Sequence, residues 1–248
     1  MPHRVMVPQS AVDKLLSAAQ DLVRGNEDAF TSLVLSHEAA LRRISSRGVD
    51  VRTVIDVGAS DGRWSRRALA FWPDARCHLI EAKEYWRPAL AHAASTQPTW
   101  SFTIAAAGPT DGTIAFYNNP EDPFSGTAYV DPASGVPMVP QVALDSEIAR
   151  HRLEPPFLIK LDTHGYEPEI LAGARRALDQ ANLVVVEAYN FQAPGRRFPD
   201  LTRSVEDAGF HCIDIGEPLF REKDQAFWQI DLFFVRADRP EAIAQGYR

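Results

Sequence analysis

The sequence from Thr53 to Trp64 reads TVIDVGASDGRW, an apolar run that ends in an acid and a glycine-containing turn. A short run rich in Val and Ile predicts a buried strand, and the turn after it opens a helix. Gly58 would let the backbone approach a ligand, because a Cβ there would collide with it. Gly62 lies where the helix and the strand would pack closely. The N–H groups of the turn would face the carboxyl end of the strand, where open α/β sheets bind their ligands.

Outside this stretch, short runs rich in Val, Ile and Leu alternate with helical patterns. This alternation predicts an α/β fold with a largely parallel sheet. The last two strands follow each other without a helical pattern between them, so they should pair antiparallel. The strands of the sheet are expected near Thr53–Val57, Arg76–Ile80, Ser101–Ala106, Phe157–Leu161, Leu183–Glu187, Phe210–Ile215 and Gln229–Val235. A hairpin insertion rich in Gly and Pro should add strands near Thr113–Tyr117, Thr127–Val130 and Val139–Ala143.

Apolar residues also recur at helical spacing between Ser10 and Arg47, with a break at Gly25 and Asn26. We therefore expect an N-terminal helical arm or cap over residues 1–50 and a main domain over residues 51–248. An amphipathic arm needs a surface to lie on. It could cover the site or form a homodimer contact.

Composition and charge narrow the function. The chain has 248 residues, of which 45% are hydrophobic and 24% charged, so it can bury a core and is not a disordered chain. Its net charge of −7 opposes the general attraction to phosphates, which disfavours nucleic acid as a partner. The first residues contain no apolar stretch typical of a secretion signal, and no apolar run is long enough for a membrane span. We expect a cytoplasmic protein.

The turn after the first strand indicates the cofactor. Ser60 stands where a dinucleotide-binding loop has its middle glycine, which disfavours a nicotinamide cofactor. Asp56 suits a cationic ligand better than a diphosphate, and a carboxylate at Glu81 can accept both hydroxyls of a ribose. S-adenosylmethionine has a ribose, a positive centre and no phosphate. The residues expected to bind it are Asp56, Gly58, Ala59, Ser60, Asp61, Gly62, Glu81, Ala106 and Ala107.

A second group of ionisable residues lies in the stretch FLIKLDTHGYEP, from Phe157 to Pro168. Alternation places Lys160 and Asp162 on one face of a strand and brings Asp162 and His164 to its carboxyl end. The next strand ends in Glu187, at the same edge of the sheet as the cofactor turn. The expected catalytic residues are therefore His164, Asp162, Lys160 and Glu187. A buried ion pair that only fixes the strand is the alternative interpretation for Lys160.

Within this group, His164 has the intrinsic pKa of a general base, and Asp162 could orient it or stabilise its charged form. A competing mechanism places Mg²⁺ on Asp162 and Glu187, where it would lower the pKa of the acceptor directly. We favour the mechanism without a metal. The other histidines show no ligand-like spacing and are expected to be structural or exposed: His3, His37, His78, His92, His151 and His211.

Taken with their spacing, these motifs resemble the FkbM-type S-adenosylmethionine-dependent methyltransferases over roughly residues 53–236. The resemblance rests on residues 55–62, 142–145, 159–174 and 229–234. It implies a class I, Rossmann-like methyltransferase fold, with a mostly parallel seven-stranded sheet whose last strand is antiparallel. It places Asp56, Gly58 and Gly62 at the cofactor, Glu81 at the ribose and Asp162 near the transferred methyl group. The family commonly has an acidic residue at the position of His164.

The resemblance most often implies methylation of a hydroxyl on a sugar or a secondary metabolite, so the expected partner is a small-molecule or glycan acceptor. Substrate selection is expected in the arm and in residues 117–140 and 189–199. Two alternatives remain open at this stage. An N-methyltransferase would need no strong base, and a methyltransferase-like binding subunit would have no catalytic role at all.

Overall fold

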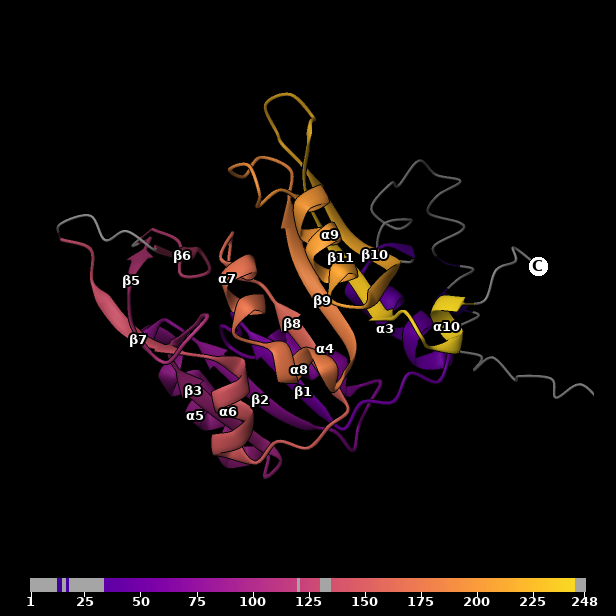
Figure 1. Cartoon of the computed structure of the whole chain (residues 1–248), viewed down its shortest axis with the longest axis horizontal. Coiled ribbons are helices and arrows are strands. Elements are labelled where there is room, and N and C mark those ends of the chain that lie inside the picture. Colours follow the sequence, from indigo (N-terminus) through magenta and orange to yellow (C-terminus); the bar gives the residue numbers. More distant parts are fainter. Residues whose placement is uncertain (1–12, 15–16, 18–33, 120, 130–134, 244–248) are drawn as a thin grey trace, which may run out of the picture.

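The computed structural model describes residues 13–14, 17, 34–119, 121–129 and 135–243, and these form an α/β sandwich of three layers (Figure 1). A seven-stranded sheet lies between two sets of helices, each with its own apolar core. One face carries α3 (His37–Ser46), α4 (Arg63–Leu69), α5 (Arg87–Thr96) and α10 (Pro240–Ile243). The other carries α6 (Leu144–His151), α7 (Glu167–Ala172), α8 (Arg175–Asp179) and α9 (Phe198–Asp207). Within the ranges given, no helix is long and apolar enough to cross a membrane.

The order of the strands in the sheet is β10-β11-β9-β8-β1-β2-β3. All neighbours are parallel except that β11 runs antiparallel to both β9 and β10. This confirms the expected mostly parallel sheet with an antiparallel last strand. The bounds are β1 (Thr53–Val57), β2 (Arg76–Glu81), β3 (Trp100–Ile104), β8 (Phe157–Leu161), β9 (Ala181–Tyr189), β10 (Phe210–Phe220) and β11 (Phe227–Arg236). Because β1, β2 and β8 are parallel, their carboxyl ends meet at one edge of the sheet.

The third predicted strand, Ser101–Ala106, is two strands in the structure. Strand β3 ends at Ile104, and β4 (Ala106–Ala107) belongs to a second sheet of order β4-β7-β5-β6. The N–H of Ala105 still donates to the carbonyl of Glu81 at 2.9 Å, after which the chain leaves β2 and pairs with β7. The partner strand, not the local sequence, decides where β3 stops.

The hairpin insertion forms most of this second sheet, as predicted. Its strands are β5 (Gly112–Asn118), β6 (Gly126–Tyr129) and β7 (Met138–Val142), and β5 pairs antiparallel with both others. The last residue of the predicted strand Thr127–Val130 lies outside the described residues. In Figure 1 these strands project beside the β3 end of the main sheet.

The helical pattern after β8 also divides into two helices, α7 and α8, at Gly173. A Cβ on Gly173 would overlap the carbonyl oxygen of Gly108, so the chain comes close to another backbone here, as the glycine predicts. The carboxylate of Asp145 accepts from the N–H groups of Arg176 at 3.1 Å and Ala177 at 2.9 Å, which caps the start of α8. The break therefore arises from contacts with segments distant in the sequence.

At the N-terminal side, the predicted helical stretch from Ser10 to Arg47 is confirmed where it falls on α3, and most of its other residues lie outside the described ranges. The apolar face of α3 is buried against the sheet through Ala40, Leu41 and Ile44. Arg43 forms a bidentate ion pair with Asp214 of β10, at 2.7 and 2.8 Å. These contacts fix the first residue of α3, His37, near the edge of the sheet where the strands end.

Candidate active site

A cavity of about 360 Å³ opens at the carboxyl ends of β1, β2 and β8, the size of a small-molecule site. It combines the two groups of residues that the sequence singled out, the cofactor turn and the ionisable cluster. The predicted site residues that line it are Gly58, Ala59, Ser60, Glu81, Ala106, Ala107, Lys160, Asp162, His164 and Glu187. The hairpin insertion contributes Phe116, Phe124, Gly126 and Ala128 to the wall.

Three predicted cofactor residues are not among the described residues that line this cavity: Asp56, Asp61 and Gly62. Asp56 is fully buried beside α4, where the hydroxyl of Ser65 donates to it at 2.7 Å. Asp61 is paired with Arg63 at 2.9 Å on the outer side of the turn. Gly62 packs closely against β2, because a Cβ placed on it would lie 3.0 Å from the side chain of Leu79. The predicted contacts of these three residues with the cofactor stay predictions, whereas the close packing predicted at Gly62 is confirmed.

Gly58 joins the cofactor turn to the end of β8. Its φ is 79°, and a Cβ there would overlap the carbonyl oxygen of Asp162. The close approach that requires glycine is therefore to this chain's own backbone, which corrects the prediction of a ligand collision. The N–H of Asp162 donates to the carbonyl of Val57 at 3.0 Å across the same junction. As a result, the cofactor turn and the ionisable cluster are held in fixed relation.

Glu81 holds the cofactor turn from the tip of β2. One carboxylate oxygen accepts from the N–H of Ser60 and the other from the N–H of Lys83, both at 2.8 Å. Ser60 has a φ of 50°, a conformation that non-glycine residues adopt mostly where surrounding contacts impose it. Burial raises the pKa of Glu81. The two hydrogen bonds and the charge of Lys83 act in the opposite direction and limit this rise. Each oxygen retains a lone pair for a further donor at the cavity.

Lys160, Asp162 and Glu187 form a buried charge cluster. The ammonium of Lys160 lies 2.5 Å from Oδ2 of Asp162 and 5.3 Å from the centre of the Trp64 ring. Burial would raise the pKa of Asp162, but the charge of Lys160 lowers it well below its usual range. Burial and the charge of Asp162 instead raise the pKa of Glu187 well above its usual value. Asp162 is therefore the stronger acid of the two carboxyl groups, and a proton shared by the pair favours Glu187.

His164 is aimed at these carboxyl groups. Its φ is 58°, and its Nδ1 lies 3.0 Å from the carbonyl oxygen of Gly126 in the hairpin insertion. A carbonyl can only accept, so Nδ1 carries the proton of the neutral ring and Nε2 keeps the lone pair. Nε2 lies 3.6 Å from Asp162 and 3.7 Å from Glu187. The imidazole thus presents a basic nitrogen to the cavity beside an anion.

Sequence reasoning missed a second charged cluster, which adjoins the first because Asp231 of β11 pairs in register with Glu187 of β9. His37 forms ion pairs with Asp231 and Glu217, and all three line the cavity. Burial alone would lower the pKa of His37, but the hydrogen bonds to the two carboxylates raise it to about 9. No local pattern marks His37, because its contact depends on how α3 packs against β10. Asp231 lies in the stretch 229–234 that carries the family resemblance, and this signal could have identified it.

The residues at the cavity fit a sulfonium nucleoside. Glu81 offers carboxylate oxygens to hydroxyl groups, Asp162 offers a negative charge, and the Ala106–Ala107 strand offers an apolar wall. Trp64 also lines the cavity, and its buried indole N–H has no hydrogen-bond partner among the described residues.

The residues at the cavity fit Mg²⁺ poorly. Asp162, His164 and Glu187 could each offer one ligand atom, and these atoms lie within 4.8 Å of one another. The ammonium of Lys160 already pairs with Asp162 at 2.5 Å, and both oxygens of Glu187 accept hydrogen bonds at 2.7 Å, from Tyr189 and Gln229. A divalent cation would have to compete with these contacts.

The profile of one protein family, the Methyltransferase FkbM domain, matches residues 56–212. A comparison with curated proteins found no significant match. Among solved structures, a methyltransferase FkbM from Methylobacillus flagellatus KT is 17% identical, with a TM-score of 0.49, and the match covers 73% of this chain and 43% of that one. This chain therefore spans less than half the length of that relative.

Two further structures resemble the chain over more of their own length. The 1,6-didemethyltoxoflavin-N1-methyltransferase of Burkholderia thailandensis, solved with 1,6-didemethyltoxoflavin and S-adenosylhomocysteine, is 15% identical, with a TM-score of 0.44 and 96% and 94% of the two chains covered. The fibrillarin pre-rRNA processing protein of Methanococcus jannaschii is 12% identical, with a TM-score of 0.47 and 76% and 68% covered.

The family profile extends from Asp56, at the end of β1, to Cys212, at the start of β10. It therefore includes the cofactor turn, Glu81 and the buried charge cluster, and it covers more than half of the chain. This protein belongs to the FkbM methyltransferase domain family.

Proposed function

We propose that the protein transfers a methyl group from S-adenosylmethionine to a hydroxyl of a small-molecule or glycan acceptor, such as a sugar, a glycoside or a secondary metabolite. The observation that carries this proposal is the orientation of His164. Its Nδ1 is held by the Gly126 carbonyl, which leaves the lone pair of Nε2 at the cavity near Asp162. A hydroxyl acceptor needs such a base, because it is a poor nucleophile until its proton is removed.

The cofactor would be held at the rim of the sheet. In this proposal Glu81 accepts from the two ribose hydroxyls, while the turn Gly58–Ser60 and the Ala106–Ala107 strand form the surrounding walls. Asp162, which lines the cavity, would offset the positive charge of the sulfonium. When bound, S-adenosylmethionine supplies an electrophilic methyl group on a positive sulfur.

His164 would take the proton of the acceptor hydroxyl at Nε2. The imidazolium that forms is stabilised by the ionised carboxylate of Asp162, 3.6 Å away. Lys160 lowers the pKa of Asp162, and a proton on the carboxyl pair would reside on Glu187. Holding the two reactants in the correct orientation would accelerate the methyl transfer further, since effective molarities in well-oriented reactions reach about 10⁵ M or more.

Both parts of the chain predicted from the sequence, the N-terminal arm and the main domain, would contribute to this site. We propose that residues 1–50 act as an arm or cap, of which α3 delivers His37 to the cavity. Residues 51–248 would form the catalytic domain. The acceptor would enter between the His37 cluster and the hairpin insertion.

The test begins with a search for the acceptor. The full chain is incubated with S-adenosylmethionine labelled in its methyl group and an extract of the producing cells, and the labelled product is identified by mass spectrometry. With that acceptor, His164→Ala should lower kcat about 10²–10⁴-fold, because the base is lost. The affinity for S-adenosylmethionine, measured by calorimetry, should stay within about threefold.

His92→Ala is the matched control, since His92 is an exposed histidine of α5 outside the cavity. An unchanged kcat in His164→Ala would remove the base from the mechanism and favour methylation of an amine. A folded chain that binds no S-adenosylmethionine would instead support a non-catalytic binding subunit.

The competing magnesium mechanism has its own measurement. The chain is treated with EDTA and freed of the chelator, and its rate of label transfer is measured with and without millimolar Mg²⁺. Because Lys160 already supplies the positive charge at Asp162, we expect the two rates to agree within about twofold. A rate that depends on added Mg²⁺ by tenfold or more would reinstate the metal at Asp162 and Glu187.

A further inference from the structure

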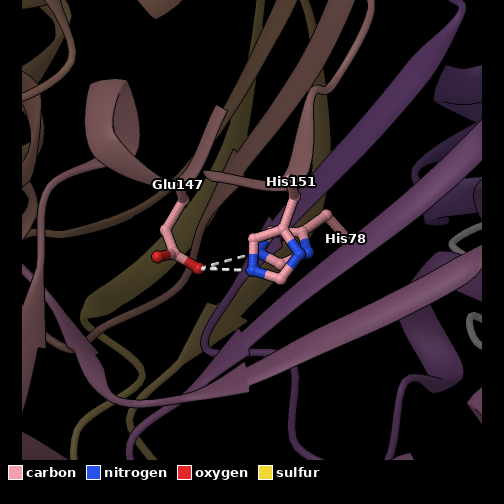
Figure 2. Close-up of side chains that lie close together, drawn as sticks. All are labelled: His78, Glu147 and His151. Atoms are coloured by element: carbon pink, nitrogen blue, oxygen red, sulfur yellow. Dashed lines mark hydrogen bonds and ion pairs between the residues drawn. The ribbon is translucent and has the colours of Figure 1, made fainter. Parts of the chain in front are cut away.

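A third cluster of ionisable side chains lies apart from the cavity, on the face of the sheet that α6 covers. His78 comes from β2, and Glu147 and His151 come from α6, where a spacing of four residues puts them on one side of the helix. Figure 2 shows the Glu147 carboxylate facing both imidazole rings. None of the three is among the described residues that line the cavity.

The three side chains bring their ligand atoms to one point. Oε2 of Glu147 lies 3.0 Å from Nε2 of His78 and 3.4 Å from Nε2 of His151. One ligand atom from each residue lies within 4.8 Å of the other two. Ligands about 2.0–2.1 Å from a tetrahedral Zn²⁺ are roughly 3.3 Å apart, so two of these separations already match the edges of such a site.

The surroundings orient these ligands. The Nδ1 of His78 lies 2.8 Å from the hydroxyl of Ser101, which leaves Nε2 directed at Glu147. The hydroxyl of Thr103 donates to Oε2 of Glu147 at 2.5 Å and lies 3.3 Å from Nε2 of His151, so it contacts two of the three ligand atoms. Hydrogen bonds such as that between Ser101 and His78 fix the orientation of metal-binding histidines.

The cluster is buried on one side and open on the other. The side chains of His78 and Glu147 are almost completely buried, whereas 27% of the His151 side chain is exposed. An ion could therefore reach the cluster from the side of His151.

The two oxygens of Glu147 face different partners. Arg150 pairs with Oε1 and also with Asp111, at 3.1 Å, whereas Oε2 faces the two histidines and is the oxygen left for a metal ion. Two imidazoles and one carboxylate suit Zn²⁺, whereas Mg²⁺ and Ca²⁺ prefer sites made of oxygen ligands.

We propose that His78, Glu147 and His151 bind one Zn²⁺, with a water molecule as the fourth ligand on the exposed side of His151. The ion would tie α6 to β2 and so fix the segment that connects the second sheet to β8. It would stabilise the fold without touching the cavity. This proposal is independent of the proposed methyl transfer.

The test measures zinc on the full, untagged chain. The protein is stripped with a chelator, equilibrated with micromolar ZnSO₄, dialysed and analysed for metal and protein. Wild type should retain about one zinc per chain. His151→Ala should bind zinc at least tenfold more weakly, because one of the three protein ligands is lost. Loss of a hydrogen bond that only supports a ligand already weakens metal binding about 10–100-fold. This variant is preferred to one at His78 because its side chain is partly exposed, and circular dichroism verifies its fold.

Two histidine variants serve as controls. His92→Ala removes an exposed histidine elsewhere, and His164→Ala removes the histidine of the cavity, so both should bind zinc like wild type. Zinc should raise the Tm of wild type and of both controls but not of His151→Ala. Retention of less than a tenth of an equivalent by wild type, or equal binding by His151→Ala, would overturn the proposal. Loss of zinc in His164→Ala alone would place the ion in the cavity and overturn it equally.

Discussion

At the scale of single residues, the protein sets the charge of each group at the cavity by its neighbours. Lys160 lowers the pKa of Asp162 well below its usual range, whereas burial and the charge of Asp162 raise the pKa of Glu187. The pKa values of these two neighbouring carboxyl groups are thus shifted in opposite directions. Neighbouring charges also set the pKa of His37, where hydrogen bonds to two carboxylates outweigh the lowering effect of burial.

The pKa of His37 makes stability depend on pH in a defined direction. The folded-state value of about 9 lies above the ordinary 6.5, so the charged histidine stabilises the folded chain fully below about pH 6.5. This contribution is lost as the pH rises through 9. His37→Gln should therefore destabilise the chain more at pH 6 than at pH 10, by roughly 3 kcal/mol from the size of the shift.

Urea unfolding of wild type and His37→Gln at both pH values measures this difference, since the other titrating groups cancel in the comparison. His211→Gln provides a control, because His211 is exposed and lies 3.8 Å from its nearest carboxylate. A difference between wild type and His37→Gln that is the same at both pH values would refute the assigned pairing.

At the scale of elements, Lys83 holds one loop of the hairpin insertion at the mouth of the cavity. Its ammonium donates to the carbonyls of Asp122, Pro123 and Ser125, at 3.2, 2.9 and 2.5 Å. Phe124 in this loop contacts Trp86 and lies under the guanidinium of Arg63. The loop thereby becomes part of the cavity wall.

Removing this ammonium should release the loop. Lys83→Met should increase amide hydrogen exchange in residues 121–126 about tenfold or more, because hydrogen bonds from a charged donor contribute about 1.5–3 kcal/mol. Hydrogen exchange with mass spectrometry reports the change directly, and Lys223→Met, at an exposed lysine far along the chain, controls for the loss of charge. Unchanged exchange in this segment would show that the loop is held by Phe124 alone.

The elements themselves were largely predictable because their signals are local. An apolar run followed by an acid and glycine turn identifies β1, and the same reasoning finds β2 and β8. The break between β3 and β4 could not be predicted, because it depends on pairing with β7, more than thirty residues later. The end of one strand was decided by a partner that no local pattern reveals.

At the scale of the whole molecule, parallel strands bring their carboxyl ends together, and this placed most predicted site residues around one cavity. Asp56 is buried in a sheet whose two faces are both covered, so alternation alone did not say whether its side chain faces the cavity. His37 and the zinc cluster arise from the packing of helices on strands. For Glu147 and His151 the spacing of four residues was a usable signal, but His78 joins them from β2, 69 residues before Glu147.

The central claim is that the rim of the sheet binds S-adenosylmethionine through Glu81. Isothermal titration of the full chain with S-adenosylmethionine tests it most directly, with Glu84→Gln as the control at an exposed glutamate three residues away. Wild type and Glu84→Gln should bind one equivalent in the micromolar range, and Glu81→Gln should bind about 10–100-fold more weakly, since hydrogen bonds to a charged group are lost. Equal affinity of Glu81→Gln and wild type, or no binding by the folded wild-type chain at millimolar cofactor, would contradict the claim.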